Sequence, residues 1–165
     1  MMTLKQILVA TDFSEPSEAA LLYGRELAMR FGARLHVLHV AQDIYVTVLG
    51  AENYLASAPG IQQQIEDAAQ QRLAEIVGAN GVGEPDTIRC VLTAASPARS
   101  IVEYAKANNI DLIVMGTHGR GAVGHLLMGS VAERVVRVAC CPVLTVKHPE
   151  REFAHPDALD RVAHA

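Results

Sequence analysis

Hydrophobic positions along the chain follow two alternating spacings. Short runs of consecutive apolar residues, typical of buried strands, alternate with longer stretches in which apolar residues recur every third or fourth position, as on one face of a helix. This alternation predicts a parallel α/β sheet, because each parallel strand needs a crossover helix before the next one. The five expected strands are Gln6–Ala10, Arg34–Ala41, Thr87–Leu92, Asp111–Met115 and Pro142–Lys147.

Residues that start and stop helices stand between these strands. Ser14 and Pro16 predict the start of a first helix as cap and first-turn proline, and Gly32 predicts its end. Its expected buried positions are Ala20, Tyr23, Leu27 and Phe31. Further helices are expected where Ile61, Ile65, Ala69, Leu73 and Ile76 recur, after Ser96-Pro97, and from about Val131 to Ala139. Because the strands are almost continuously apolar, helices should cover both faces of a doubly wound, three-layer fold.

Two segments lie outside this pattern. Gln42–Gly60 is long for a connection, and both a lid or interaction segment and a poorly ordered surface loop remain open. The polar residues 148–165 form either a loose tail, which we expect, or a short packed helix. The expected organisation is therefore one domain over residues 1–147, followed by a C-terminal tail.

Composition narrows the classes of function. The net charge of −4 argues against general binding to nucleic acid or to anionic membranes, and no apolar run approaches the about 18 residues that span a bilayer. The N-terminus lacks the organisation of a signal peptide, and three cysteines without metal-type spacing suit the cytoplasm. We expect the adjacent Cys140 and Cys141 to be a buried apolar pair rather than a redox pair.

Candidate chemistry lies where two strands end. The first strand ends in Thr11-Asp12, and the fourth is followed by the glycine-rich Gly116–Gly121. Ligands of open parallel sheets bind beyond the carboxyl ends of the strands, so both segments face one crevice if these strands are neighbours. Either turn could also be purely structural: Asp12 can serve as a turn residue between a strand and a helix.

The glycine-rich segment has the properties of a phosphate-binding turn. Gly116 and Gly119 allow positive φ and close approach of a ligand to the backbone, while Gly129-Ser130 opens a helix whose first N–H groups can bind an anion. Ser130–Glu133 also reads as a capping box, in which Ser130 caps the helix.

The spacing Gly116-x2-Gly119-x9-Gly129-Ser130 resembles the nucleotide signature of the universal stress protein family, in its ATP-binding branch. The resemblance extends over about residues 2–147, including Thr11–Ser14, Leu38–Val40 and Pro142–Val146. It implies an adenine-nucleotide α-hydrolase-like fold of five parallel strands in the order 3-2-1-4-5, and a homodimer through the edge strand Pro142–Lys147. Ala10 replaces a proline that is common in the family.

The resemblance also implies the ligand contacts. The backbone at Val40 would meet the adenine, Ala10, Thr11 and Asp12 would lie near base and ribose, and Met115 and Gly116 would line the ribose. The expected phosphate contacts are Gly119, Arg120, Gly129, Ser130 and Val131, with His118 either touching phosphate or solvated. Asp12 would bind sugar hydroxyls or share a Mg²⁺ ion with the nucleotide.

The expected function is binding of ATP, or another adenine nucleotide, as a regulatory stress-response signal. No Gly-Lys-Ser/Thr P-loop supplies the usual lysine for phosphoryl transfer, so an enzyme is not expected. Two alternatives remain: a slow Mg²⁺-dependent ATPase or phosphotransfer enzyme using Asp12 with His118 or Arg120, and a dimeric interaction module that binds no nucleotide. His36 and His39 lack a second group of ligands, so a metal site there is not expected.

Overall fold

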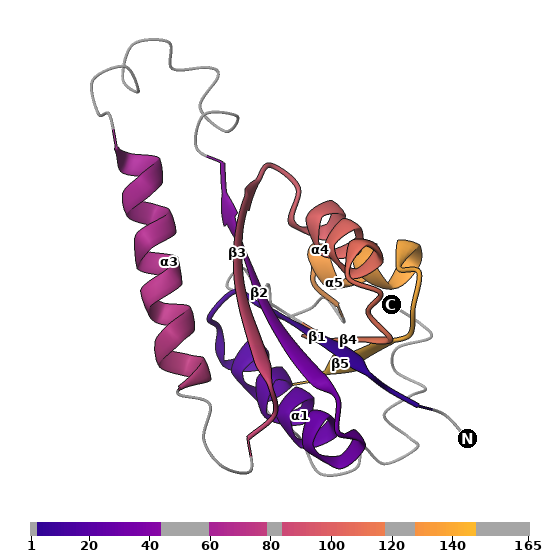
Figure 1. Ribbon diagram of the computed structural model, residues 1–165. Helices are drawn as coiled ribbons and strands as arrows, with labels where there is room; N and C mark the ends of the chain where they lie inside the picture. The colour runs from indigo at the N-terminus through magenta and orange to yellow at the C-terminus, as the bar shows by residue number, and fades with distance from the viewer. Residues whose placement is uncertain (1–2, 44–59, 79–83, 118–127, 148–165) are drawn as a thin grey trace, which may run out of the picture.

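The computed structural model describes residues 3–43, 60–78, 84–117 and 128–147. Its centre is a sheet of five parallel strands in the order β3-β2-β1-β4-β5 (Figure 1), which confirms the expected topology. The strands are β1 (Gln6–Thr11), β2 (Arg34–Gln42), β3 (Thr87–Ala94), β4 (Leu112–Gly116) and β5 (Val143–Val146). Each lies within two residues of its predicted position, because consecutive apolar residues mark the centre of a strand better than its ends.

Helices cover both faces of this sheet. The helices are α1 (Glu15–Phe31), α3 (Ile61–Val77), α4 (Pro97–Ala107) and α5 (Ser130–Val138). Successive residues of a strand point to opposite faces, so Val9 packs in one buried cluster with α1 and α3, and Leu8 in another with α4 and α5. The result is the expected three-layer arrangement (Figure 1). No helix in the described part of the chain is long and apolar enough to cross a membrane.

The buried face of α1 differs from the prediction. Ala20 is buried and Leu27 is half-buried, as predicted, but Tyr23 and Phe31 are exposed, at 43% and 44%. The buried residues of α1 are Ser17, Ala20, Leu21, Gly24 and Ala28. All of them except Leu21 are small, which lets α1 lie close to the sheet; a Cβ on Gly24 would collide with the side chain of Val9. A search for large apolar residues at helical spacing therefore misses this face.

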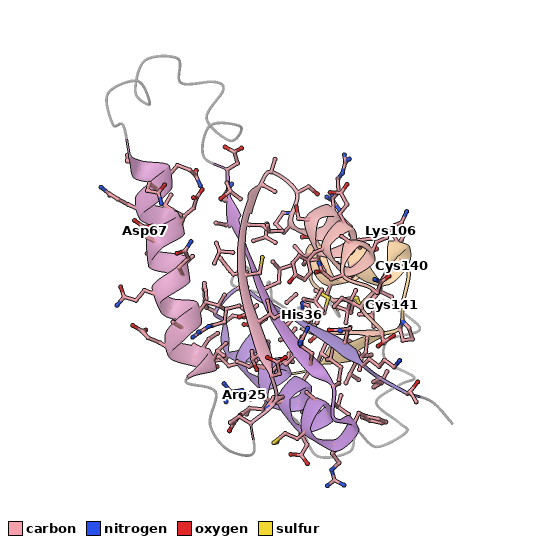
Figure 2. All side chains as sticks on the ribbon, viewed as in Figure 1. Arg25, His36, Asp67, Lys106, Cys140 and Cys141 are labelled. Carbon is pink, nitrogen blue, oxygen red and sulfur yellow. The ribbon has the colours of Figure 1, made fainter. Side chains whose placement is uncertain are left out.

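The adjacent cysteines also differ from the prediction. Cys140 is exposed and Cys141 is half-buried, so the expected buried pair is wrong for Cys140 (Figure 2). The reason is that α5 ends at Val138, and Cys140 lies in the turn that leads to β5. Burial, followed by the neighbouring Cys140, raises the pKa of Cys141 to about 11, which keeps this thiol protonated at neutral pH.

Candidate functional site

The register of the sheet brings the predicted segments together. Ala10 on β1 pairs with Leu38 on β2 and with Met115 on β4. The next residues, Thr11 and Gly116, are the last of β1 and β4 and therefore lie side by side at the carboxyl edge of the sheet, with His39 beside Thr11 on β2, which continues to Gln42. This confirms that β1 and β4 are neighbours, as a shared crevice requires.

The turn from β1 to α1 is fixed by its own side chains. The Thr11 hydroxyl is buried, accepts a hydrogen bond from the backbone N–H of Phe13 at 3.0 Å, and shares another with the Ser17 hydroxyl at 3.0 Å. Thr11 was predicted to lie near base and ribose. Because its hydroxyl is used to hold the turn, only the backbone of Thr11 remains available to contact a ligand.

Asp12 follows in the same turn and is half-buried. Its Oδ1 accepts hydrogen bonds from the backbone N–H of Ser14 at 3.2 Å and from the Ser14 hydroxyl at 2.5 Å. Ser14 stands at the N-cap of α1, as predicted, but its hydroxyl donates to Asp12 and does not cap the helix. The carboxylate is thus oriented at the end of β1 by a local turn.

Phe13 lies in this turn, and His39 of β2 packs against it. No local motif predicts this contact. Phe13 has a φ of 63°, in the left-handed region, and its ring lies 4.3 Å from that of His39 between centroids. His39 Nδ1 donates to the carbonyl oxygen of Thr11 at 2.9 Å. The resemblance includes both Thr11–Ser14 and Leu38–Val40, but it assigned neither Phe13 nor His39 a role.

Gly116 ends β4 for a reason other than the one expected. The described glycines with positive φ are Gly32, Gly60 and Gly78, so the predicted positive φ at Gly116 is wrong. A Cβ at Gly116 would lie 2.9 Å from the Cβ and the carbonyl carbon of Pro16. Close packing of the first turn of α1 against β4 is therefore what excludes a side chain here.

The chain leaves β4 and returns as α5 through a direct contact. The backbone N–H of Thr117 donates to Val146 on β5 at 2.9 Å, and the backbone N–H of Gly129 donates to the Thr117 carbonyl at 2.6 Å. The predicted loop residues His118, Gly119 and Arg120 lie outside the described residues. Their two flanks are nevertheless hydrogen-bonded to each other, so the loop starts and ends at one point.

The start of α5 corrects the capping-box interpretation. The N-cap is Gly129, with φ −71° and ψ 153°, and no side chain caps the helix. Ser130 is the first helical residue and is exposed. Since the N–H of Gly129 is already bonded to Thr117, the groups that a helix start leaves unpaired are the backbone N–H groups of Ser130, Val131 and Ala132. They point out of the helix N-terminus, where the helix dipole favours an anion.

An apolar surface adjoins this N-terminus. Ala10 and Met115 are buried in the cluster under α4 and α5, and the half-buried Val40, Met128 and Val131 pack against it. One end of the sheet thus holds an apolar surface, the half-buried carboxylate of Asp12 and the unpaired N–H groups at the start of α5. This combination suits a ligand with a flat apolar part, hydroxyl groups and phosphates.

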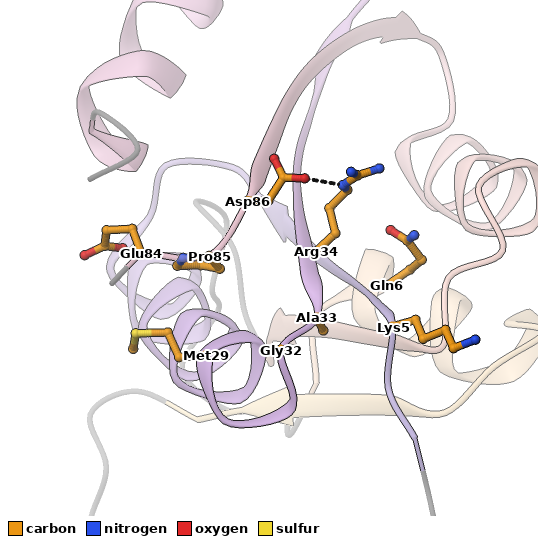
Figure 3. Close-up of a pocket in the computed structure, with 9 residues that line it drawn as sticks. All are labelled: Lys5, Gln6, Met29, Gly32, Ala33, Arg34, Glu84, Pro85 and Asp86. Carbon is orange, nitrogen blue, oxygen red and sulfur yellow. Dashed lines mark hydrogen bonds and ion pairs between the residues drawn. The ribbon is translucent and has the colours of Figure 1, made fainter. Parts of the chain in front are cut away.

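A hollow of about 550 Å³ lies at the opposite end of the sheet (Figure 3). It is formed by the start of β1 and β2 and by the end of α1, around Lys5, Arg34 and Met29. Arg34 and Asp86 are joined across it by an ion pair of 2.5 Å. None of the predicted site residues lines this hollow, so it is separate from the candidate site.

Comparison with known proteins agrees with the geometry. Residues 3–147 match the description of the universal stress protein family. The chain belongs to the universal stress protein family. A relative from Thermus aquaticus, named as a universal stress protein, is 38% identical over 143 residues, which cover 87% of this chain and 98% of the relative.

Solved structures extend the comparison. The protein MJ0577 of Methanocaldococcus jannaschii superposes on this universal stress protein with a TM-score of 0.72 at 25% identity, over 93% of this chain and 100% of that chain. A universal stress protein from Archaeoglobus fulgidus, solved in complex with dAMP, superposes with a TM-score of 0.61 at 21% identity, over 89% of this chain and 100% of that one. The second likeness shows a shared fold.

Proposed function

We propose that this universal stress protein binds ATP at the carboxyl end of β1 and β4 and acts as a nucleotide-dependent regulator in the stress response. The observation that carries the proposal is the position of the α5 N-terminus, which the Thr117–Gly129 hydrogen bond holds against the end of β4. Two adjacent features complete a nucleotide site: the half-buried Asp12 and the apolar surface formed by Ala10, Val40 and Met115.

The parts of the nucleotide are assigned by chemistry. The adenine would lie on the apolar side, with its polar edge at the backbone of Val40 and with Ala10 and Thr11 beside it. The ribose would lie between Asp12, whose carboxylate can accept hydrogen bonds from hydroxyl groups, and the Met115–Gly116 backbone. The phosphates would lie at the α5 N-terminus, on the N–H groups and hydroxyl of Ser130 and the N–H of Val131.

The predicted loop contacts complete this proposal. The segment that joins Thr117 to Met128 would contact the phosphates through Gly119 and Arg120. His118 of the same segment would either touch a phosphate or be solvated. The N–H of Gly129 already donates to Thr117, so Gly129 would not donate to the phosphates. Its part would be to start α5 beside them as the N-cap. Arg120 would supply a cation that is absent from the described part of the site, where the N–H groups carry only partial charges.

A magnesium ion would suit the same place. Mg²⁺ prefers carboxylate and phosphate oxygens, and Asp12 is the carboxylate at the end of β1, held in a fixed orientation by Ser14. Bound with ATP, the ion would neutralise charge on the phosphates. Asp12 would then act as the protein's ligand to it, directly or through water.

We also propose that the protein is a cytoplasmic homodimer joined at β5. Within the described residues, β5 pairs only with β4 and forms one edge of the sheet. Leu144 on this edge and the nearby Val136 and Val138 of α5 are exposed apolar residues. Pairing with a second copy would satisfy the edge and cover them. Light scattering at micromolar concentration should give twice the chain mass; a monomer mass would contradict the dimer.

The cytoplasmic location is proposed from the three free thiols, which suit a reducing compartment.

Isothermal titration of the purified protein with ATP, ADP, AMP and adenosine, each with and without Mg²⁺, tests the proposed function. Affinity should rise with the number of phosphates, because each adds charge at the α5 N-terminus. Native mass spectrometry should show whether an adenine nucleotide is retained on purification. Absence of binding at millimolar ATP would contradict the proposal, and release of ADP in multiple turnovers would instead support the enzyme alternative.

A further inference from the structure

The turn that carries Asp12 contains a residue in an unfavourable backbone conformation. Phe13 has a φ of 63°, and residues with a Cβ, bulky ones above all, rarely adopt positive φ. Such a conformation persists only where surrounding contacts enforce it, and it often occurs at functional sites.

Two contacts come from other elements. The His39 ring from β2 lies 4.3 Å from the Phe13 ring, tilted by 33°. The Arg72 guanidinium from α3 lies 5.4 Å from the Phe13 ring centre, within the range of a cation–π interaction. Phe13 itself is buried in the cluster under α1 and α3. The aromatic side chain is thus fixed on one face of the sheet, while Asp12 stands at the sheet's end.

His39 is the residue that links the ring to the backbone. Its Nδ1 lies 2.9 Å from the carbonyl oxygen of Thr11, and since a carbonyl oxygen only accepts, Nδ1 carries the proton. The same imidazole therefore holds the residue before Asp12 through its N–H and the residue after Asp12 through its ring. Asp12 lies between the two anchored positions.

We propose that His39 is a positioning residue for nucleotide binding, which acts by fixing the Thr11–Phe13 turn and so the direction in which Asp12 presents its carboxylate. The inference rests on the proposed nucleotide site. It assigns His39 no contact with the ligand; its whole effect on affinity passes through Asp12.

A double-mutant cycle tests this, with the dissociation constant for ATP measured by isothermal titration and, for weak variants, by ligand-observed NMR. His39→Ala should weaken ATP binding by about tenfold, as expected for a misplaced charged hydrogen-bonding group. In an Asp12→Ala background the same substitution should change affinity by less than about threefold, because the group it positions is already gone. His39→Asn, whose amide N–H replaces the Nδ1 donor, should recover most of the lost affinity.

The matched control is His36→Asn, on the same strand but with both ring nitrogens bonded to Tyr104 and Gln6, away from the turn. It should lower thermal stability and leave ATP affinity unchanged. Equal losses from His39→Ala with and without Asp12 would overturn the inference, as would wild-type affinity in His39→Ala. The proposed function is judged separately: if the wild-type protein does not bind ATP, both fail, whereas a binding wild type with an additive cycle removes only the role of His39.

Discussion

The backbone N–H of Gly129 donates to the carbonyl oxygen of Thr117 at 2.6 Å, so the end of β4 and the start of α5 are hydrogen-bonded across the intervening loop. This contact fixes the α5 N-terminus against the end of β4, the strand next to β1 in the sheet. It also decides which N–H groups remain for a ligand, since Gly129 is used and Ser130 becomes the first open position.

Gly116→Ala should destabilise the fold. The new Cβ would lie 2.9 Å from two carbon atoms of Pro16, so α1 or β4 must shift, at a cost of about 1–3 kcal/mol in the free energy of unfolding. Urea unfolding checks this. Gly32→Ala is a useful comparison: nothing lies within 4 Å of its Cβ, and its φ of 62° alone should cost about 1–2 kcal/mol. Wild-type stability in Gly116→Ala would show that the packing against Pro16 is looser than described.

Arg25→Ala should also destabilise the protein. The Arg25 guanidinium on α1 donates to the carbonyl oxygen of Ile76 at 3.1 Å and to that of Val77, at the end of α3. These carbonyls have no partner within the helix, and loss of the charged donor should cost about 1–2 kcal/mol.

The control for this substitution is Arg30→Ala on the same helix. Arg30 forms an exposed ion pair with Glu26 at 3.1 Å, and its loss should change stability by less than about 0.5 kcal/mol. Thermal unfolding of both variants gives the comparison. Equal effects would contradict a special role for Arg25.

Much of the fold follows from the apolar pattern alone. The strands of this sheet are covered on both faces, so their residues are apolar in succession, and the helix signals between them are clear at Pro16, Gly32 and Pro97. The buried face of α1 could not be predicted in this way, because small residues such as Gly24 and Ala28 do not stand out as a periodic row of large apolar side chains. They are buried because α1 packs closely on the sheet, where Gly24 lies against Val9 of β1.

The candidate site was predictable in its location and less so in its details. Strand ends are set by the sheet, which placed Thr11, Asp12 and Gly116 together. The reason for the glycine at position 116 depends on Pro16, a residue of another element that the local sequence does not reveal. Likewise, the left-handed Phe13 and the hydrogen bond from His39 to Thr11 join residues far apart in the chain, which no local motif records.

The stability of the protein should fall as the pH falls below about 6.5. Burial first, and then the charge of Arg34, lowers the pKa of His36, while Asp86 opposes the shift. Gln6 Oε1 accepts from His36 Nε2 at 2.8 Å, and in the neutral imidazole Nδ1 then accepts from the Tyr104 hydroxyl at 2.9 Å. The neutral imidazole thus suits both partners.

The sign follows from linkage. Because the folded-state pKa lies below the unfolded value, the unfolded chain binds the proton more readily, and the stabilising contribution is present above pH 6.5 and is lost as the pH falls through the folded pKa. The slope of unfolding free energy against pH should reach at most about 1.4 kcal/mol per pH unit from this residue. Chemical unfolding of His36→Gln between pH 7.5 and 5.5 should show a flatter dependence than the wild type; an identical slope would contradict the assignment.

The central claim is that nucleotide phosphates lie at the N-terminus of α5, and Ser130→Asp tests it most directly. A carboxylate in the first turn suits the helix dipole, so the melting temperature without ligand should stay the same or rise, while repulsion should weaken ATP binding by at least about tenfold.

The control is Gln63→Glu, which adds the same charge to the first turn of α3 at an exposed position. It also removes the hydrogen bond from Gln63 to Asp67 at 2.9 Å, so it is a control for ATP affinity and not for stability. The deciding measurement is isothermal titration of ATP into the wild type and both variants. We predict wild-type affinity for Gln63→Glu and at least tenfold weaker binding for Ser130→Asp, in a protein that is equally stable. Wild-type ATP affinity in Ser130→Asp would show that the phosphates lie elsewhere and would contradict the account.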